Sequence, residues 1–216
     1  MRVESKYRHL LILLIYLLLY MLCFYYLEKS VSSYRIIHLK LDDFIPFCEY
    51  FVIPYLLWFP YIAGVTLYFC LANRPGFPRL AAFLMISMTL FLIVSALYPN
   101  GQNLRPLYFT RHNVLTDIVG LVYASDTPTN ILPSIHVLNT VAVQAAICTD
   151  RKLSSRRPIL IGSWILSVLI IASTVLIKQH SMMDVILALI IGSVLYLVLY
   201  RGMFSLRPEA QKWPIQ

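Results

Sequence analysis

Six long apolar runs constrain the fold of this chain more than any other feature. Each is long enough, or nearly so, to cross a bilayer, because a membrane-spanning helix needs about 20 consecutive apolar residues. The 216 residues are 59% hydrophobic and only 13% charged, unlike those of an ordinary soluble domain. We therefore predict an all-α polytopic membrane protein in which residues 1–216 form one domain with six transmembrane helices. The predicted spans are residues 9–27, 47–72, 80–98, 133–149, 159–177 and 182–200.

The first apolar run follows a basic start, as the apolar part of a signal peptide does. However, the run is long, is followed by Glu28 and Lys29, and lacks a small-residue cleavage pattern. We therefore expect it to remain in the protein as a membrane anchor.

The longest stretch between predicted spans covers residues 99–132. A loop of this size without structure is uncommon unless it is functional. Part of it carries apolar residues at helical spacing, which predicts a short amphipathic helix at the membrane interface between spans three and four. These apolar residues are Val114, Leu115, Ile118, Val119 and Val122.

The net charge of +8 is explained better by membrane topology than by nucleic-acid binding, because the basic residues stand between apolar spans and form no long run. With both termini in the cytoplasm, twelve cations lie inside and six outside, as the positive-inside rule requires. The inner set is Arg2, Lys6, Arg8, Arg74, Arg79, Arg151, Lys152, Arg156, Arg157, Arg201, Arg207 and Lys212, and the outer set is Lys29, Arg35, Lys40, Arg105, Arg111 and Lys178. This orientation predicts that residues 99–132 and 178–181 share the outer face.

His180 and Asp184 are four residues apart, so on a helix they lie on one face and touch. A carboxylate bonded to one ring nitrogen fixes the histidine tautomer and leaves the other nitrogen as a directed nucleophile or base. The structural alternative is a helix start in which Ser181 and Asp184 form a capping box and Lys178 is an interfacial charge.

Two further patterns precede this pair in the chain. Pro133-Ser134-Ile135-His136 opens the fourth predicted span, where free backbone N–H groups and the helix dipole favour an anion. Arg105-Pro106 places a guanidinium at the predicted interface, where it suits bidentate phosphate binding. The alternatives are a plain helix start with an interfacial histidine and an arginine that only extends toward the membrane surface.

No metal ion or other cofactor is predicted. The candidate site contains few carboxylates (Asp117, Asp126 and Asp184), and they are not clustered as magnesium requires. The four cysteines show neither metal-ligand spacing nor a disulfide framework.

The order Arg-Pro, Pro-Ser-x-His and His-x-x-x-Asp on one membrane face resembles the type 2 phosphatidic acid phosphatase superfamily of lipid phosphatases and phosphotransferases. The resemblance covers about residues 98–195. The bare His-x-x-x-Asp with Pro-Ser-x-His also looks like the inositol phosphorylceramide synthase and sphingomyelin synthase branch. Two family cations are missing, because Tyr98 stands at the lysine position of the first signature and Thr174 follows Ser173 in place of arginine. Lys178 is the expected substitute, and Arg111 is a weaker one.

The resemblance implies a metal-independent phosphatase that acts on a lipid phosphomonoester or pyrophosphate, resembling phosphatidic acid or a polyprenyl pyrophosphate. It implies a phosphohistidine on His180, orientation of that ring by Asp184, and acid–base catalysis by His136. The phosphate would be held by Arg105, Ser134 and Lys178.

Two alternatives are consistent with the sequence: a phosphotransferase that passes the phosphoryl head group to a hydroxylated lipid, and an inactive membrane scaffold or transporter. The expected partners are the lipid phosphate substrate and membrane lipids, not nucleic acid, and no pattern predicts an oligomeric state. The compact layout suits a bacterial plasma membrane, with the active site facing outward.

Overall fold

The computed structural model describes residues 2–30, 33–72 and 75–202, and for residues 2–9 the backbone only. Long apolar segments form helices because a helix satisfies every backbone polar group internally, as a bilayer requires. The longer helices are α1 (Arg2–Ser30), α3 (Val52–Ala72), α4 (Phe77–Leu97), α5 (Val114–Ser125), α6 (Ile135–Thr149), α8 (Arg157–Leu176) and α9 (Met182–Tyr196). The short elements are β1 (Arg35–Ile36), α2 (Lys40–Phe44), η1 (Glu49–Phe51), β2 (Asn100–Gly101), α7 (Arg151–Ser154) and the π-helical turn η2 (Leu197–Arg201).

Five helices in the described part of the chain are long and apolar enough to cross a membrane, which makes this an integral membrane protein. They are Leu10–Ser30, Glu49–Ala72, Phe77–Leu97, Arg157–Leu176 and Met182–Arg201. The predicted span at 133–149 forms α6, which has 15 residues and is about 22 Å long, against about 30 Å of hydrocarbon. The six-span count therefore stays a prediction.

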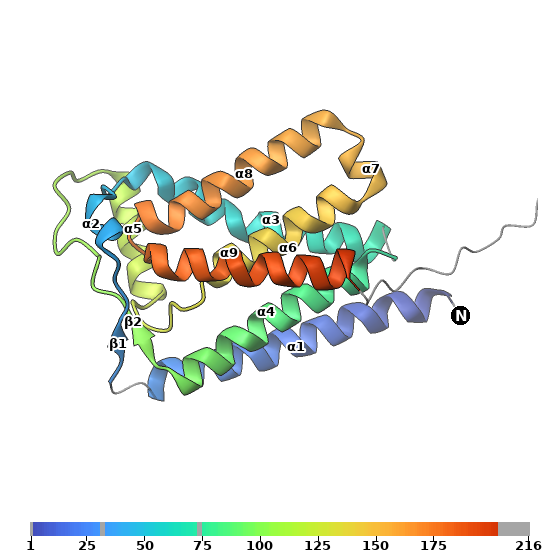
Figure 1. Cartoon of the computed structure of the whole chain (residues 1–216), viewed down its shortest axis with the longest axis horizontal. Helices are drawn as coiled ribbons and strands as arrows, with labels where there is room; N and C mark the ends of the chain where they lie inside the picture. The colour runs from blue at the N-terminus through green and yellow to red at the C-terminus, as the bar shows by residue number, and fades with distance from the viewer. Residues whose placement is uncertain (1, 31–32, 73–74, 203–216) are drawn as a thin grey trace, which may run out of the picture.

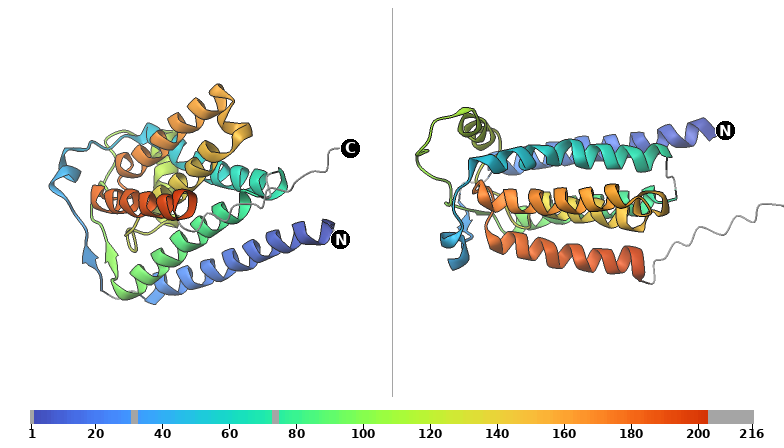
Figure 2. Two further views of the ribbon diagram at one scale, coloured as in Figure 1. Left: turned by 45° about the vertical axis from the view of Figure 1, so that its right-hand side comes forward. Right: turned by 90° about the horizontal axis from the view of Figure 1, so that it is seen from above.

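Helix α6 is the centre of the bundle and contacts α3, α4, α8 and α9 (Figure 1). Its side chains Ala142 and Ala146 are buried beside Phe83 of α4, in one apolar cluster. Small residues let membrane helices approach closely. Helix α1, by contrast, runs beside α4 at the edge of the bundle (Figure 2). The short α6 is thus enclosed by longer helices.

The short elements gather at the two ends of the bundle. Figure 1 shows β1, β2, α2 and α5 at one end and α7 at the other. At the first end, the Gln102 Nε2 group donates to the Lys178 carbonyl (2.9 Å) and the Tyr123 hydroxyl donates to the Ile177 carbonyl (2.6 Å). Residues 99–132 and 178–181 therefore lie together, as predicted, although which membrane face they occupy stays a prediction. In the charge count, Arg74, Arg207 and Lys212 lie outside the described residues.

The predicted interfacial helix is present as α5, and its position at an interface stays a prediction. Its N-cap is Asn113, whose side-chain oxygen accepts from the Leu115 and Thr116 N–H groups at 2.9 and 3.0 Å. Val119 and Val122 are buried, and Leu121 is 70% exposed. The apolar spacing thus places one face of α5 against the bundle.

The segment that enters α6 is fixed by backbone pairing at the same end. Strands β1 and β2 pair in parallel, and Gly101 also forms an antiparallel bridge with Thr129. The Asn100 side-chain oxygen accepts from the N–H groups of Ile131 and Leu132, both at 2.9 Å. A carboxylate from the end of α1, Glu28, accepts from Asn130 at 2.7 Å. These contacts position the chain immediately before the first turn of α6.

Candidate active site

His180 and Asp184 form the pair predicted from their spacing. The His180 Nδ1 atom lies 2.7 Å from Asp184 Oδ2, across the start of α9. Both side chains are buried, and the His180 ring is 7% exposed. Ser181 is the N-cap of α9, and its hydroxyl accepts from the Met183 N–H at 3.1 Å. The capping alternative is therefore right for Ser181, while the Asp184 carboxylate is used to orient the histidine.

His136 faces this pair from the first turn of α6. Its Nδ1 atom lies 3.3 Å from His180 Nε2, the nitrogen that Asp184 leaves available. The His136 ring packs against Trp58 and Tyr55 of α3, with centroid distances of 4.4 and 4.7 Å. Trp58 Nε1 also donates to the His136 carbonyl at 3.1 Å. Two histidines separated by 44 positions are thus held in contact, and both are buried.

Ser134 is the N-cap of α6, and its buried hydroxyl accepts a long bond of 3.4 Å from the Val137 N–H. The first turn of a helix presents backbone N–H groups and the positive end of the helix dipole. Ser134 and His136 therefore bring hydroxyl, imidazole and N–H groups to one end of α6.

Arg105 lies beside the C-terminal end of α5. Its Nη1 and Nη2 atoms donate to the carbonyls of Tyr123 (3.0 Å) and Asp126 (2.5 Å), and its guanidinium stacks over the Tyr123 ring at 4.4 Å. Its buried Nε atom has no hydrogen-bond partner among the described residues. Burial lowers the pKa of Arg105, and the carboxylate of Asp126 opposes that shift.

The charges around His180 act on its ionisation. Burial lowers the pKa of His180, but the charge of Asp184 and the hydrogen bond to it outweigh burial, so the pKa is raised above the ordinary value. Asp126 adds to the rise, and Arg105 opposes it. Both side chains therefore lie within electrostatic reach of the imidazole.

Lys178, predicted to bind phosphate, is directed elsewhere. Its Nζ atom donates to the carbonyls of Asp42 (2.9 Å) and Ile45 (2.5 Å), in and just after α2. Burial lowers the pKa of this amine, and the carboxylates of Asp42 and Asp43 oppose that shift. Lys178 has a left-handed backbone, with φ 56°, which is unusual for a residue other than glycine. In this structure its charge is used to hold α2 against the loop that carries His180.

Tyr98 and Thr174, which stand at the two positions without the expected cations, make other contacts here. The guanidinium of Arg35 lies over the Tyr98 ring, 5.0 Å from its centroid. The Thr174 hydroxyl donates to the Ile171 carbonyl at 2.8 Å, inside α8. The Thr174 carbonyl accepts the His180 N–H at 2.9 Å, which helps to turn the chain between α8 and α9.

Sequence reasoning missed two groups of residues around the histidines. Asp42 of α2 is 2% exposed, and its carboxylate accepts from the Ser181 hydroxyl at 2.6 Å and the Met182 N–H at 2.7 Å. The Asp126 carboxylate accepts from Tyr55 (2.8 Å) and Gln179 (3.0 Å). No local pattern marks Asp42 as a cap for a helix 140 positions away. In the sequence, Asp126 stands out only as one of three carboxylates that are not clustered.

Fold and site together define a helical membrane protein with a carboxylate-oriented histidine facing a second histidine at one end of the bundle. The sequence matches the PAP2 superfamily over residues 79–208, more than half of the chain, and the protein belongs to that superfamily. Members are generally phosphatases or phosphotransferases. The matched region contains every predicted site residue. Comparison with curated proteins and with solved structures found no match, and the likeness to the inositol phosphorylceramide synthase branch stays a prediction.

Proposed function

We propose that this protein is a lipid phosphate phosphatase that hydrolyses a lipid phosphomonoester or pyrophosphate through a phosphohistidine intermediate. One observation carries the proposal: His180 is bonded to Asp184 through Nδ1, and its Nε2 atom faces His136 at 3.3 Å. A nucleophilic histidine needs this arrangement, in which a carboxylate fixes the tautomer and the second nitrogen keeps a free electron pair.

In the first step, His180 Nε2 attacks the phosphorus atom and the bond between phosphorus and the leaving oxygen breaks. His136, which must be an imidazolium when the substrate is bound, gives a proton to that oxygen and becomes neutral, so a lipid alcohol or a lipid monophosphate leaves. In the second step, His136 takes a proton from water as the water oxygen bonds to phosphorus and the bond to Nε2 breaks. Inorganic phosphate is released, and both histidines return to their starting state.

Binding of the phosphoryl group would use groups already present at this end of the bundle. Arg105, whose Nε atom has no partner in the described part of the chain, supplies positive charge, while Ser134 and the N–H groups opening α6 supply hydrogen-bond donors. Because the Lys178 amine is held by two carbonyls, we assign it a positioning role through α2 instead of a direct bond to phosphate.

The proposal is tested by phosphate release from phosphatidic acid and from a polyprenyl pyrophosphate in detergent micelles, with EDTA present. We expect release by the wild-type protein and by His38→Ala, whose partially exposed ring pairs with Asp43 on the surface. We expect none by His180→Ala. Retained release by His180→Ala at the wild-type rate contradicts the nucleophile assignment.

Substrate labelled with ³²P at the terminal phosphate tests the intermediate directly. The expected product is an acid-labile, alkali-stable phosphoprotein in the wild type and not in His180→Ala. If lipid is consumed only after addition of a hydroxylated acceptor lipid, with no free phosphate, the reaction is phosphoryl transfer and the hydrolase assignment is wrong.

A further inference from the structure

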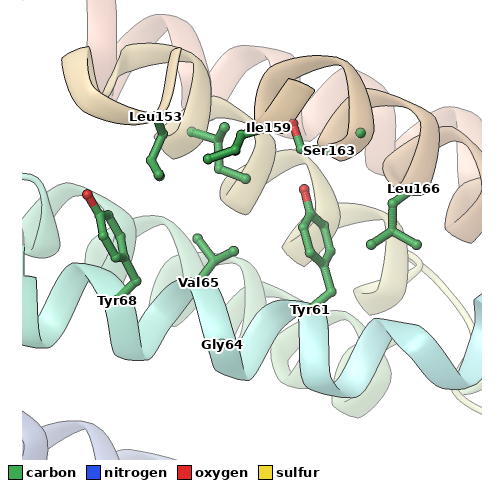
Figure 3. Close-up of a pocket in the computed structure, with 10 residues that line it drawn as sticks. Tyr61, Gly64, Val65, Tyr68, Leu153, Ile159, Ser163 and Leu166 are labelled. Carbon is green, nitrogen blue, oxygen red and sulfur yellow. The ribbon is translucent and has the colours of Figure 1, made fainter. Parts of the chain in front are cut away.

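A cavity lies between α3 and α8, away from the histidines. Its volume is about 330 Å³, within the range of small-molecule sites, about 300–1,000 Å³. Figure 3 shows Tyr61 on α3 pointing toward Ser163 on α8, with Val65 and Leu166 directed into the space beside them. A Cβ atom added at Gly64, which also lines the cavity, would meet nothing within 4 Å. Glycine therefore leaves this space open to an apolar occupant.

The cavity extends from the middle of α3 and α8, at Tyr61 and Leu166, toward the end of the bundle opposite the candidate active site. Ile159 lines it near the start of α8, whereas His180 follows the end of that helix. A helix from Ile159 to Leu176 extends about 25 Å. A phosphate group bound at the histidines therefore lies far from the end of the cavity marked by Ile159.

A basic turn closes the cavity at that end. Residues 150–157 connect α6 to α8 through α7, and two residues beside this turn's cations, Leu153 and Ile159, line the cavity. The turn carries four exposed cations and one carboxylate, Asp150, which is buried and accepts the Leu153 N–H at 2.6 Å. The cations are Arg151, Lys152, Arg156 and Arg157. Tyr68, which also lines the cavity, is within electrostatic reach of both Asp150 and Arg156.

We propose that this cavity and turn form a binding site for one anionic phospholipid of the adjacent leaflet. An acyl chain fills the apolar space between α3 and α8, and the phosphodiester lies against Arg156 and Arg157. Basic pockets between transmembrane helices bind anionic head groups in this way. A zwitterionic lipid fits less well, because its ammonium group would lie among the exposed cations of the turn, whose one carboxylate, Asp150, is buried and accepts the Leu153 N–H. The site is separate from the proposed catalytic function and does not depend on it.

The test is retention of lipid by the full chain in native mass spectrometry, after exchange into detergent with equal phosphatidylglycerol and phosphatidylcholine. We expect preferential retention of one phosphatidylglycerol. Arg156→Gln with Arg157→Gln should weaken retention about 30-fold, because each cation near a membrane surface favours an anionic lipid by about fivefold. Gly162 of α8 also lines the cavity. Gly64→Leu with Gly162→Leu should abolish retention by filling the cavity, and this loss would exclude Arg105, at the other end of the bundle, as the binding site.

Matched controls separate this site from general surface charge. Arg35→Gln with Lys40→Gln removes two exposed cations at the other end of the bundle, and Gly120→Leu adds the same side chain where a Cβ meets nothing within 4 Å. Both should retain phosphatidylglycerol as the wild type does. Equal retention of the two lipids by the wild type, or unchanged retention by the Arg156/Arg157 variant, overturns the proposal. The arginine variant decides the question even if the leucine variant does not fold, because both arginines are exposed.

Discussion

Asp42 in α2 accepts a hydrogen bond from the backbone N–H of Met182, the first residue of α9, at 2.7 Å. The other carboxylate oxygen accepts from the hydroxyl of Ser181 at 2.6 Å. The first N–H groups of a helix have no partner within the helix, so a carboxylate here caps α9 from a distant part of the chain. The same contact holds the residue that follows His180.

Asp42→Ala should therefore lower both stability and activity. Loss of the cap and of the bond to Ser181 leaves buried donors unsatisfied, at a cost of roughly 1–3 kcal/mol. We expect kcat to fall more than KM rises, because the His180 ring is misoriented while Arg105 is untouched. Thermal unfolding and steady-state kinetics measure the two effects. Asp43→Ala is the control, since Asp43 is exposed and contacts His38, and an equal loss in this variant contradicts the assignment.

The raised pKa of His180 predicts the acidic limb of the pH–rate profile. The nucleophile must be neutral at Nε2, so kcat/KM falls as the pH drops through the pKa of His180. Since Asp184 raises that pKa, the midpoint should lie above about 6.5, the ordinary histidine value. In Asp184→Asn the midpoint should move to lower pH, with kcat reduced about 10²–10⁴-fold through loss of the oriented tautomer. A wild-type midpoint below about 6.5 would show that a group other than His180 controls the acidic limb.

Arg105→Lys tests the geometry of phosphate binding. The guanidinium is held by the carbonyls of Tyr123 and Asp126 and stacks on the Tyr123 ring, and a lysine reproduces neither contact. We expect KM for the lipid phosphate to rise about 10–100-fold, the equivalent of one charge-assisted hydrogen bond. Arg111→Lys is the matched control, because its side chain is 71% exposed and lies 3.9 Å from Glu49. An unchanged KM in Arg105→Lys would place the phosphate elsewhere.

Gly101→Ala should destabilise the segment that leads into α6. A Cβ atom at Gly101 would lie 2.6 Å from the Tyr34 ring and 2.8 Å from the Pro128 carbonyl oxygen, and the latter is backbone. We expect a loss of about 1–3 kcal/mol, as for overpacking elsewhere. Gly120→Ala, where the added atom meets nothing within 4 Å, should be neutral or slightly stabilising. Thermal unfolding in detergent compares the two variants. Equal unfolding temperatures would show that Tyr34 and the backbone at Pro128 move away from the added atom at no measurable cost in stability.

Sequence reasoning was most successful where the interaction is local. The spacing of His180 and Asp184 predicted their contact, since positions four apart share a helix face. The amphipathic spacing after Asn113 predicted α5, and its cap agrees with helix-start rules. Five apolar runs became helices long enough to span a membrane. The sixth run became the shorter α6, because its helix begins after Ser134 and ends before Asp150.

The sequence alone determined the kind of chain, a helical membrane protein, and the contact between His180 and Asp184, because these depend on apolar length and helical spacing. Only the tertiary structure decided how those pieces meet. It placed His136 against His180, directed Lys178 to α2, and brought Asp42 to the start of α9. These contacts join residues 44 to 140 positions apart, and no periodic pattern specifies them. They depend on how the helices pack and on which buried polar groups need a partner.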